Sequence, residues 1–217
     1  MRVSPWLVAT FLVVGACTKS ETAQSKGANG APASVSEGTA AAVVDNGRAT
    51  FNLQAEGGVA WGSAVPKGHG YSLQGTDGNQ RGKVKIDPDQ VKIKDGAGAT
   101  AAKAKAKAYG FKIYEGERAV AKIKHKSAGY LLSHADGSEL GTLNTKGAGG
   151  VVGGATITVK TQDAMHVVVR DGETVGGVGV EVSPRAAAFL GVTELKYEQR
   201  LAAVIYFQEH LIKPREP

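Results

Sequence analysis

The chain has 217 residues, of which 42% are hydrophobic and 21% charged, and its formal net charge is +6. This length fits a single domain of moderate size plus a tail. The only cysteine excludes a disulfide within the chain. No segment reaches the ~20 consecutive apolar residues of a transmembrane helix.

Residues 1–16 have the three parts of a secretory signal. Arg2 is a minimal positive region, residues 6–14 are an apolar core, and two small residues follow. Residues 14–17, Val-Gly-Ala-Cys, resemble the lipobox of bacterial lipoproteins. The resemblance implies cleavage before Cys17, acylation of Cys17 and anchoring in a membrane of the bacterial cell envelope. Thr18 in place of aspartate implies the outer membrane. The alternative is an ordinary signal peptide in which Cys17 is incidental.

The acylated cysteine would be followed by a flexible linker, within residues 17–48. Residues 18–48 contain no aromatic residue and few large aliphatic ones. Such a segment buries too little apolar surface to offset the entropy of ordering. About thirty residues of this kind have an end-to-end distance of roughly 30 Å, which would hold a domain just off the membrane.

Residues 49–217 are predicted to form one mainly β domain. Residues 83–86, 91–94 and 121–124 alternate polar and apolar side chains, the period of half-buried strands. Asp-Gly pairs at 77–78, 95–96, 136–137 and 171–172 are typical of hairpin turns. Residues 101–108 alternate alanine and lysine. Their composition favours a helix, but their phase relative to residues 122–126 predicts a strand with alanine inside and lysine outside.

An internal repeat runs through these strands. Gly70-Tyr71 and Gly129-Tyr130 are each followed, at identical spacing, by an Asp-Gly turn and a second strand. Gly110-Phe111 begins a third copy whose turn is one residue shorter. Each copy predicts a hairpin that must pack on its neighbours to bury its apolar face.

The C-terminal region is predicted to be helical. Ser183-Pro184 is a helix start and Gly191 a stop, which gives a helix over about 184–191. A second helix is expected over about 194–212. Residues 201–207 are apolar on every face, so this helix should be surrounded by protein. We therefore expect a sheet that wraps around the helix.

The pattern as a whole resembles the tubby C-terminal-like domain and its LURP-one and phospholipid-scramblase relatives. It covers roughly residues 50–212, and residues 136–141 with Tyr130 and Leu132 are the closest local match. The resemblance implies an antiparallel barrel of about twelve strands around a hydrophobic C-terminal helix, and a role at membranes. No lipid-binding residue of that family can be carried over. Another antiparallel barrel, or a sandwich with a terminal helix packed on it, is the alternative fold.

Charge is the strongest functional signal. Residues 83–126 hold eleven lysines and Arg118 against five acidic residues. On each strand the lysines share one face, and each could contribute about 1 kcal/mol near an anionic membrane. The alternative is a solvated barrel exterior whose edges are protected by lysine. The candidate residues for binding anionic lipid are Lys83, Lys85, Lys92, Lys94, Lys103, Lys105, Lys107, Lys122, Lys124 and Lys126.

No other residues predict a reaction. Ser133, His134 and Asp136 combine triad residue types, but neighbours on a strand face opposite sides of the sheet. The five histidines have no short metal-ligand spacing, although His125 and His134 would be near each other if paired across a hairpin. We therefore expect no cofactor, no metal, no catalysis and no nucleic-acid partner. The expected role is binding or structural, at a membrane or a cell-wall polymer. An apolar-ligand carrier with a barrel cavity, or an enzyme whose site the sequence does not reveal, are the alternatives.

Overall fold

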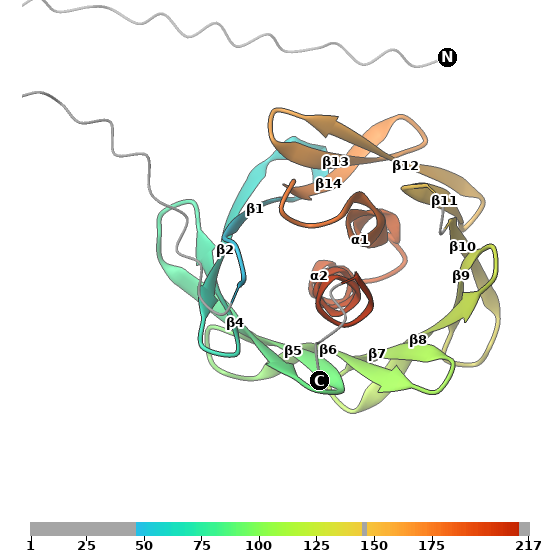
Figure 1. The fold of residues 1–217 in the computed structure, drawn as a ribbon, viewed down its shortest axis with the longest axis horizontal. Helices are drawn as coiled ribbons and strands as arrows, with labels where there is room; N and C mark the ends of the chain where they lie inside the picture. The colour runs from blue at the N-terminus through green and yellow to red at the C-terminus, as the bar shows by residue number, and fades with distance from the viewer. Residues whose placement is uncertain (1–46, 145–146, 213–217) are drawn as a thin grey trace, which may run out of the picture. The chain divides into compact units, whose positions relative to one another are not determined.

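The fold is a closed antiparallel β-barrel (Figure 1). The structure is a computed structural model and describes residues 47–144 and 147–212. Each strand pairs with the next along the chain, and β1 closes the barrel against β14. The strands are β1 (Phe51–Gln54), β2 (Ala60–Lys67), β3 (Gly70–Gly75), β4 (Gln80–Asp87), β5 (Gln90–Asp95), β6 (Thr100–Lys107), β7 (Gly110–Glu115), β8 (Arg118–Lys126), β9 (Gly129–His134), β10 (Glu139–Asn144), β11 (Gly149–Val152), β12 (Ala155–Gln162), β13 (Met165–Arg170) and β14 (Glu173–Gly179).

The barrel therefore has fourteen strands, and the expected number of about twelve is wrong. Two of the strands, β1 and β11, are only four residues long, and β11 begins with Gly149-Gly150. Segments so short and so rich in glycine show little of the alternation on which a count from sequence depends. Because the sheet closes into a barrel, the alternative prediction of a sandwich is wrong.

The predicted hairpin repeat is confirmed. The copies that begin at Gly70, Gly110 and Gly129 form the hairpins β3–β4, β7–β8 and β9–β10. The aspartates of the predicted turns accept hydrogen bonds at short range: Asp77 Oδ1 accepts from the Asn79 N–H at 3.0 Å, and Asp136 Oδ1 from the Ser138 N–H at 2.9 Å. These local bonds fix the turns and hence the strand register.

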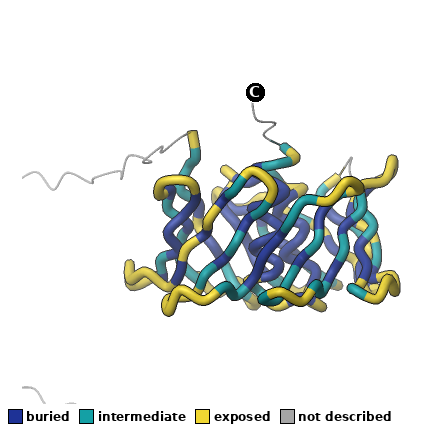
Figure 2. The backbone as a smooth tube through the Cα atoms, turned by 90° about the horizontal axis from the view of Figure 1, so that it is seen from below, coloured by how far each residue is buried: buried dark blue, intermediate teal, exposed yellow. Residues whose placement is uncertain are grey.

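The two ends of the barrel differ. The described chain, residues 47–212, begins and ends at the same end of the barrel, here called the terminal end; the opposite end is the far end (Figure 2). The register shifts beside the far-end turn in β1–β2, β3–β4, β5–β6, β7–β8, β9–β10 and β13–β14. Bulges bend and twist the strands that carry them, so their repetition at one end contributes to the curvature that closes the barrel.

Helices occupy the interior of the barrel (Figure 1). They are α1 (Pro184–Ala187), the 3₁₀ turn η2 (Ala188–Gly191), α2 (Tyr197–Phe207) and the π-helical turn η3 (Gln208–Ile212). Ser183 caps α1 as predicted, because its Oγ accepts a hydrogen bond from the Ala186 N–H at 3.2 Å. Helix α2 begins at Tyr197, later than expected, since the chain first turns at Val192 and Leu195.

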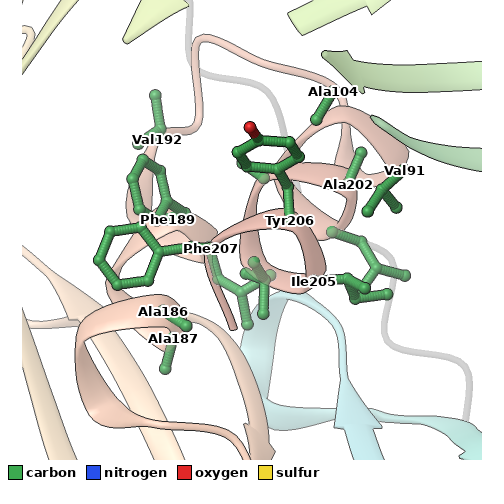
Figure 3. Packing of buried hydrophobic residues seen from close by; sticks show 14 of the residues in the cluster. Val91, Ala104, Ala186, Ala187, Phe189, Val192, Ala202, Ile205, Tyr206 and Phe207 are labelled. Carbon is green, nitrogen blue, oxygen red and sulfur yellow. The ribbon is translucent and has the colours of Figure 1, made fainter. Parts of the chain in front are cut away.

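Helix α2 and the inner faces of the strands share one core (Figures 1 and 3). The helix packs against β5, β6 and β7. Ala102 and Ala104 on β6 are fully buried, so the predicted strand with alanine inside is confirmed, and the small side chains let the helix approach. The expectation of a hydrophobic C-terminal helix holds only for part of its length, because α2 also buries Gln199 and Arg200.

Polar contacts fix the helical segment at both ends of the barrel. At the terminal end, Glu209 accepts hydrogen bonds from Arg48 Nε at 3.0 Å and from the Tyr71 hydroxyl at 2.9 Å. At the far end, Arg200 donates to the Leu190 carbonyl at 2.9 Å and to Glu56 at 3.0 Å. Buried charges need such partners, so these contacts set the depth of α2 in the barrel.

Candidate functional site: a lysine face on the barrel wall

The ten predicted lysines all lie on one side of the barrel wall, on β4, β5, β6 and β8. On each of these strands they alternate with buried residues such as Val84, Ile93 and Ala121. Since alternate residues on a strand face opposite sides of the sheet, the lysines face outward. We call this surface the lysine face. It also contains Lys112 on β7, between the buried Phe111 and Ile113.

Lys112 is the one lysine of this surface that the predicted site residues omitted. The signal for it was present in the sequence. Residues 110–115 alternate in the same way as the neighbouring strands, with Phe111 and Ile113 inside and Lys112 outside. It lies opposite Lys105 on one side and Lys122 on the other, so it connects β6 to β8.

Lysines stand directly opposite one another across neighbouring strands. Side chains at such positions have β-carbons about 4.5–5.5 Å apart, and like charges there are destabilising. Rows of like charge therefore destabilise the sheet. The opposed pairs are Lys83–Lys94, Lys85–Lys92, Lys92–Lys103, Lys105–Lys112 and Lys112–Lys122.

Acidic residues offset part of the charge of this surface. Asp87 lies 3.0 Å from Lys85 Nζ and 4.0 Å from Lys92 Nζ, and the hydrogen bond from Lys85 contributes most to lowering the pKa of Asp87. Asp89 lies 3.6 Å from Lys105. Both aspartates flank the terminal-end turn between β4 and β5. In the described part of the chain, Lys94, Lys112, Lys122 and Lys124 have no ion pair within 4.0 Å, so the lysines named on β7 and β8 stay uncompensated.

Lys103 differs from the other lysines, since it is only 8% exposed. Its Nζ donates to both carboxylate oxygens of Glu117 at 3.0 Å and lies 4.8 Å from the centre of the Tyr114 ring. A lysine already satisfied by a carboxylate and an aromatic ring is the least able to bind an added anion. Its position in the row is as expected, but its environment is that of a structural contact.

The wall on the other side of the barrel carries little charge. The exposed outward residues of β10, β11 and β12 include Thr142, Val151, Thr156 and Thr158, with Lys160 near the end of β12. The lysines are thus concentrated on one side of a continuous sheet. General protection of a barrel exterior would not produce this asymmetry.

The other candidate residues do not assemble. Ser133 Oγ donates to the Lys122 carbonyl at 3.5 Å and Asp136 accepts from Ser138, so among the described residues no hydrogen bond joins Ser133, His134 and Asp136. His134 pairs with Ala121 and His125 with Tyr130, which places the two rings at opposite ends of the barrel. Within residues 47–144 and 147–212, no three His, Cys, Asp or Glu side chains are grouped as a metal site would require.

Cys17 and the linker lie outside the described residues. Among the helices of the described part, none is long and apolar enough to cross a bilayer.

Comparison with known proteins adds little. No protein-family model and no curated protein matches the chain. One X-ray structure of a protein from Arabidopsis thaliana aligns over 67% of this chain and 90% of that protein, with 11% sequence identity and a TM-score of 0.21. Similarity at this level supports no conclusion about fold or function.

Proposed function

We propose that the protein is a bacterial envelope lipoprotein, anchored through Cys17, whose lysine face binds the anionic headgroups of a membrane. The observation that carries the proposal is the set of directly opposed lysines on β4 to β8. Such rows destabilise the free sheet, and an anionic surface would remove that penalty. The role proposed is binding, without catalysis.

The packing of the core disfavours the carrier alternative. Val204, Ile205 and Phe207 are each at most 2% exposed and belong to the same core as the inner strand residues (Figure 3). Their side chains occupy the space beside the helix that an apolar ligand would need.

Vesicle binding tests the lysine face. The full chain carrying Cys17→Ser, which removes the acylation site, is mixed with neutral vesicles or with vesicles containing phosphatidylglycerol. We expect binding only to the anionic vesicles, and its loss at about 1 M salt, where the Debye length is about 3 Å. Lys112→Gln with Lys122→Gln should weaken binding about fivefold per lysine, since each contributes about 1 kcal/mol.

The matched control removes two lysines outside the face, Lys67 and Lys160. Lys67→Gln with Lys160→Gln has the same net charge as the test variant and should change binding less than twofold. Equal loss in both variants would mean that net charge, and not the lysine face, governs binding. Binding to soluble polyphosphate without binding to anionic vesicles would mean that the lysine face binds a polyanionic polymer and not a lipid.

The anchor has its own test. Cys17→Ser in the producing cells should move the protein from the membrane to the soluble fraction and abolish labelling by a fatty-acid probe. The physical reason is that each buried CH₂ of an acyl chain contributes about 0.8 kcal/mol to membrane binding. A variant that stays membrane-bound in high salt would exclude Cys17 as the anchor.

A further inference from the structure

A second surface feature lies at the terminal end, where Lys107 and Lys124 of the lysine face border it. A pocket of about 520 Å³ is bounded by the turn between β6 and β7, the end of β8, the start of β9 and the end of the helical segment. This volume is within the range of small-molecule sites. The residues that matter for its chemistry are Lys107, Tyr109, His125, Tyr130, Tyr206 and Leu211.

The floor of the pocket is a rigid set of aromatic rings. The Tyr206 ring centre lies 4.6 Å from that of Phe111, and the Tyr130 ring centre lies 4.9 Å from that of Phe207. His125 stacks on Tyr130 at 5.1 Å with 31° between the ring planes. Rings fixed by a core in this way need no ordering when a ligand arrives.

Tyr206 presents an unused hydroxyl to this pocket. The residue is only 4% exposed, and its hydroxyl makes no hydrogen bond to any described residue. The hydroxyl projects away from helix α2 (Figure 3). Burial raises the pKa of Tyr206, so the group is a neutral hydrogen-bond donor. The Tyr206 hydroxyl is not one of the fully enclosed polar atoms that lack a partner, so it is open to the pocket and can donate to a ligand there.

The rim of the pocket is cationic. Lys107 is exposed beside the opening, and Lys124 Nζ lies 5.7 Å from the centre of the Tyr109 ring. The pocket has no acidic lining residue among those described. Asp89, whose charge acts on Tyr206, is already 3.6 Å from Lys105. The charges around the opening therefore favour an anion.

We propose that this pocket binds the ring of an anionic sugar, such as a uronic acid. A pyranose has an apolar C–H face that matches the tyrosine rings, hydroxyls that match the Tyr206 donor, and a carboxylate that matches Lys107 and Lys124. A fatty acid fits less well than a sugar acid, because its carboxylate could pair with the rim but its chain would leave the tyrosine hydroxyls without partners.

Titration of the full chain with glucuronate, glucose and octanoate, followed by NMR chemical shifts, tests the site. We expect glucuronate to shift the amide signals of residues 107–110 and 125 and to leave β12 unchanged. Glucose should bind about tenfold more weakly, because it lacks the charge that Lys107 and Lys124 would pair with.

Variants separate this pocket from other surfaces. Tyr206→Phe keeps the ring and should weaken glucuronate binding about tenfold, as expected for a lost hydrogen bond to a charged or polar ligand. The control, Tyr114→Phe, removes a hydroxyl on the barrel wall and should leave binding unchanged. Lys112→Gln with Lys122→Gln should also leave it unchanged, so failure of the lysine face and failure of the pocket are distinguishable.

Three results would overturn the pocket proposal. One is the absence of shifts at residues 107–110 and 125 with 50 mM glucuronate. Another is tighter binding of octanoate than of glucuronate. The third is equal glucuronate affinity in the parent protein and in Tyr206→Phe.

Discussion

Three glycines of the repeat act through their lack of a side chain. Gly70, Gly110 and Gly129 each precede an aromatic residue at a strand start, and a β-carbon at any of them would overlap a carbonyl oxygen of the neighbouring strand. For Gly129 that oxygen belongs to Leu143. The glycines therefore allow close approach of neighbouring strands at the terminal end, which explains why the sequence repeats them.

Gly129→Ala should lower the free energy of unfolding by about 1–3 kcal/mol, since the strands must separate to admit the methyl group. Urea denaturation measures the change. Gly147→Ala is the control, because a β-carbon there meets no atom within 4 Å. Equal stability of the two variants would show that strand approach at Gly129 is adjustable.

His166 links stability to pH. Its ring is buried, and its Nδ1 lies 3.0 Å from Thr161 Oγ1. Burial lowers the pKa of His166 below its ordinary value of 6.5, while the charge of Glu181 acts less strongly in the opposite direction. The unfolded chain therefore takes up a proton at a higher pH than the folded protein. The stability contributed by the neutral ring is present above pH 6.5 and declines as the pH falls toward the lowered pKa.

His166→Gln should flatten the fall in unfolding free energy between pH 7 and pH 5. Urea denaturation across this range gives the unfolding free energy of the parent protein and of His166→Gln, and the slopes of the two values with pH are compared. His134→Gln removes an exposed histidine and controls for loss of an imidazole. A slope in His166→Gln equal to that of the parent protein would contradict the assignment.

At the scale of elements, Arg170 connects β13 to the segment before α2. Its guanidinium donates to Glu194 at 2.6 and 2.9 Å, to the Gly191 carbonyl at 3.1 Å and to the Val152 carbonyl at 3.1 Å. The hydrogen bond from Arg170 also holds the pKa of Glu194 below its usual range. One side chain thus joins strands β11 and β13 to the loop that leads into the helix.

Arg170→Met should lower the unfolding free energy by about 2–4 kcal/mol, because it leaves Glu194 and two carbonyls without their donor in a half-buried site. Thermal or urea unfolding measures the loss. Arg118→Met is the control, since its exposed pair with Glu115 should contribute less than about 1 kcal/mol. A similar effect of both variants would contradict the role given to Arg170.

Whether a structural feature can be predicted from the sequence depends on how many neighbouring residues determine it. The alternation in β6 and the Ser183 cap were predicted because each depends on a few neighbouring residues. The number of strands was underestimated, since strands of four residues, such as β1 and β11, carry too little pattern. The burial of Lys103 could not be predicted, because Tyr114 and Glu117 come from later segments. The pocket at Tyr206 is likewise assembled from elements far apart in the sequence.

Over the whole molecule, the charges are sorted by position. Among the described residues of the barrel wall, the acidic ones lie in the turns or at strand ends, as with Asp77, Glu117 and Asp136, whereas the lysine face runs along the wall. The barrel therefore has one strongly basic side. A surface arranged for stability alone would alternate the two signs across neighbouring strands.

Lys112→Thr should raise the unfolding free energy by about 0.5–1 kcal/mol at low salt, because it removes two like-charge oppositions and introduces a good strand former. High salt should reduce the gain by screening the repulsion. Lys160→Thr, on the other side of the barrel, should have little effect. A loss of stability in Lys112→Thr would mean that the opposed lysines do not strain the free protein.

The closure of the barrel has a consequence for how it opens. Only Leu53–Val178 and Gln54–Gly177 pair β1 with β14, whereas β12 and β13 pair over six positions. This short seam makes β1 the strand that detaches with the fewest broken hydrogen bonds. Its release would uncover the edges of β2 and β14, which are templates for a strand from another copy. Exchange of β1 between molecules is therefore the route to dimers that this topology favours when the protein is concentrated or heated.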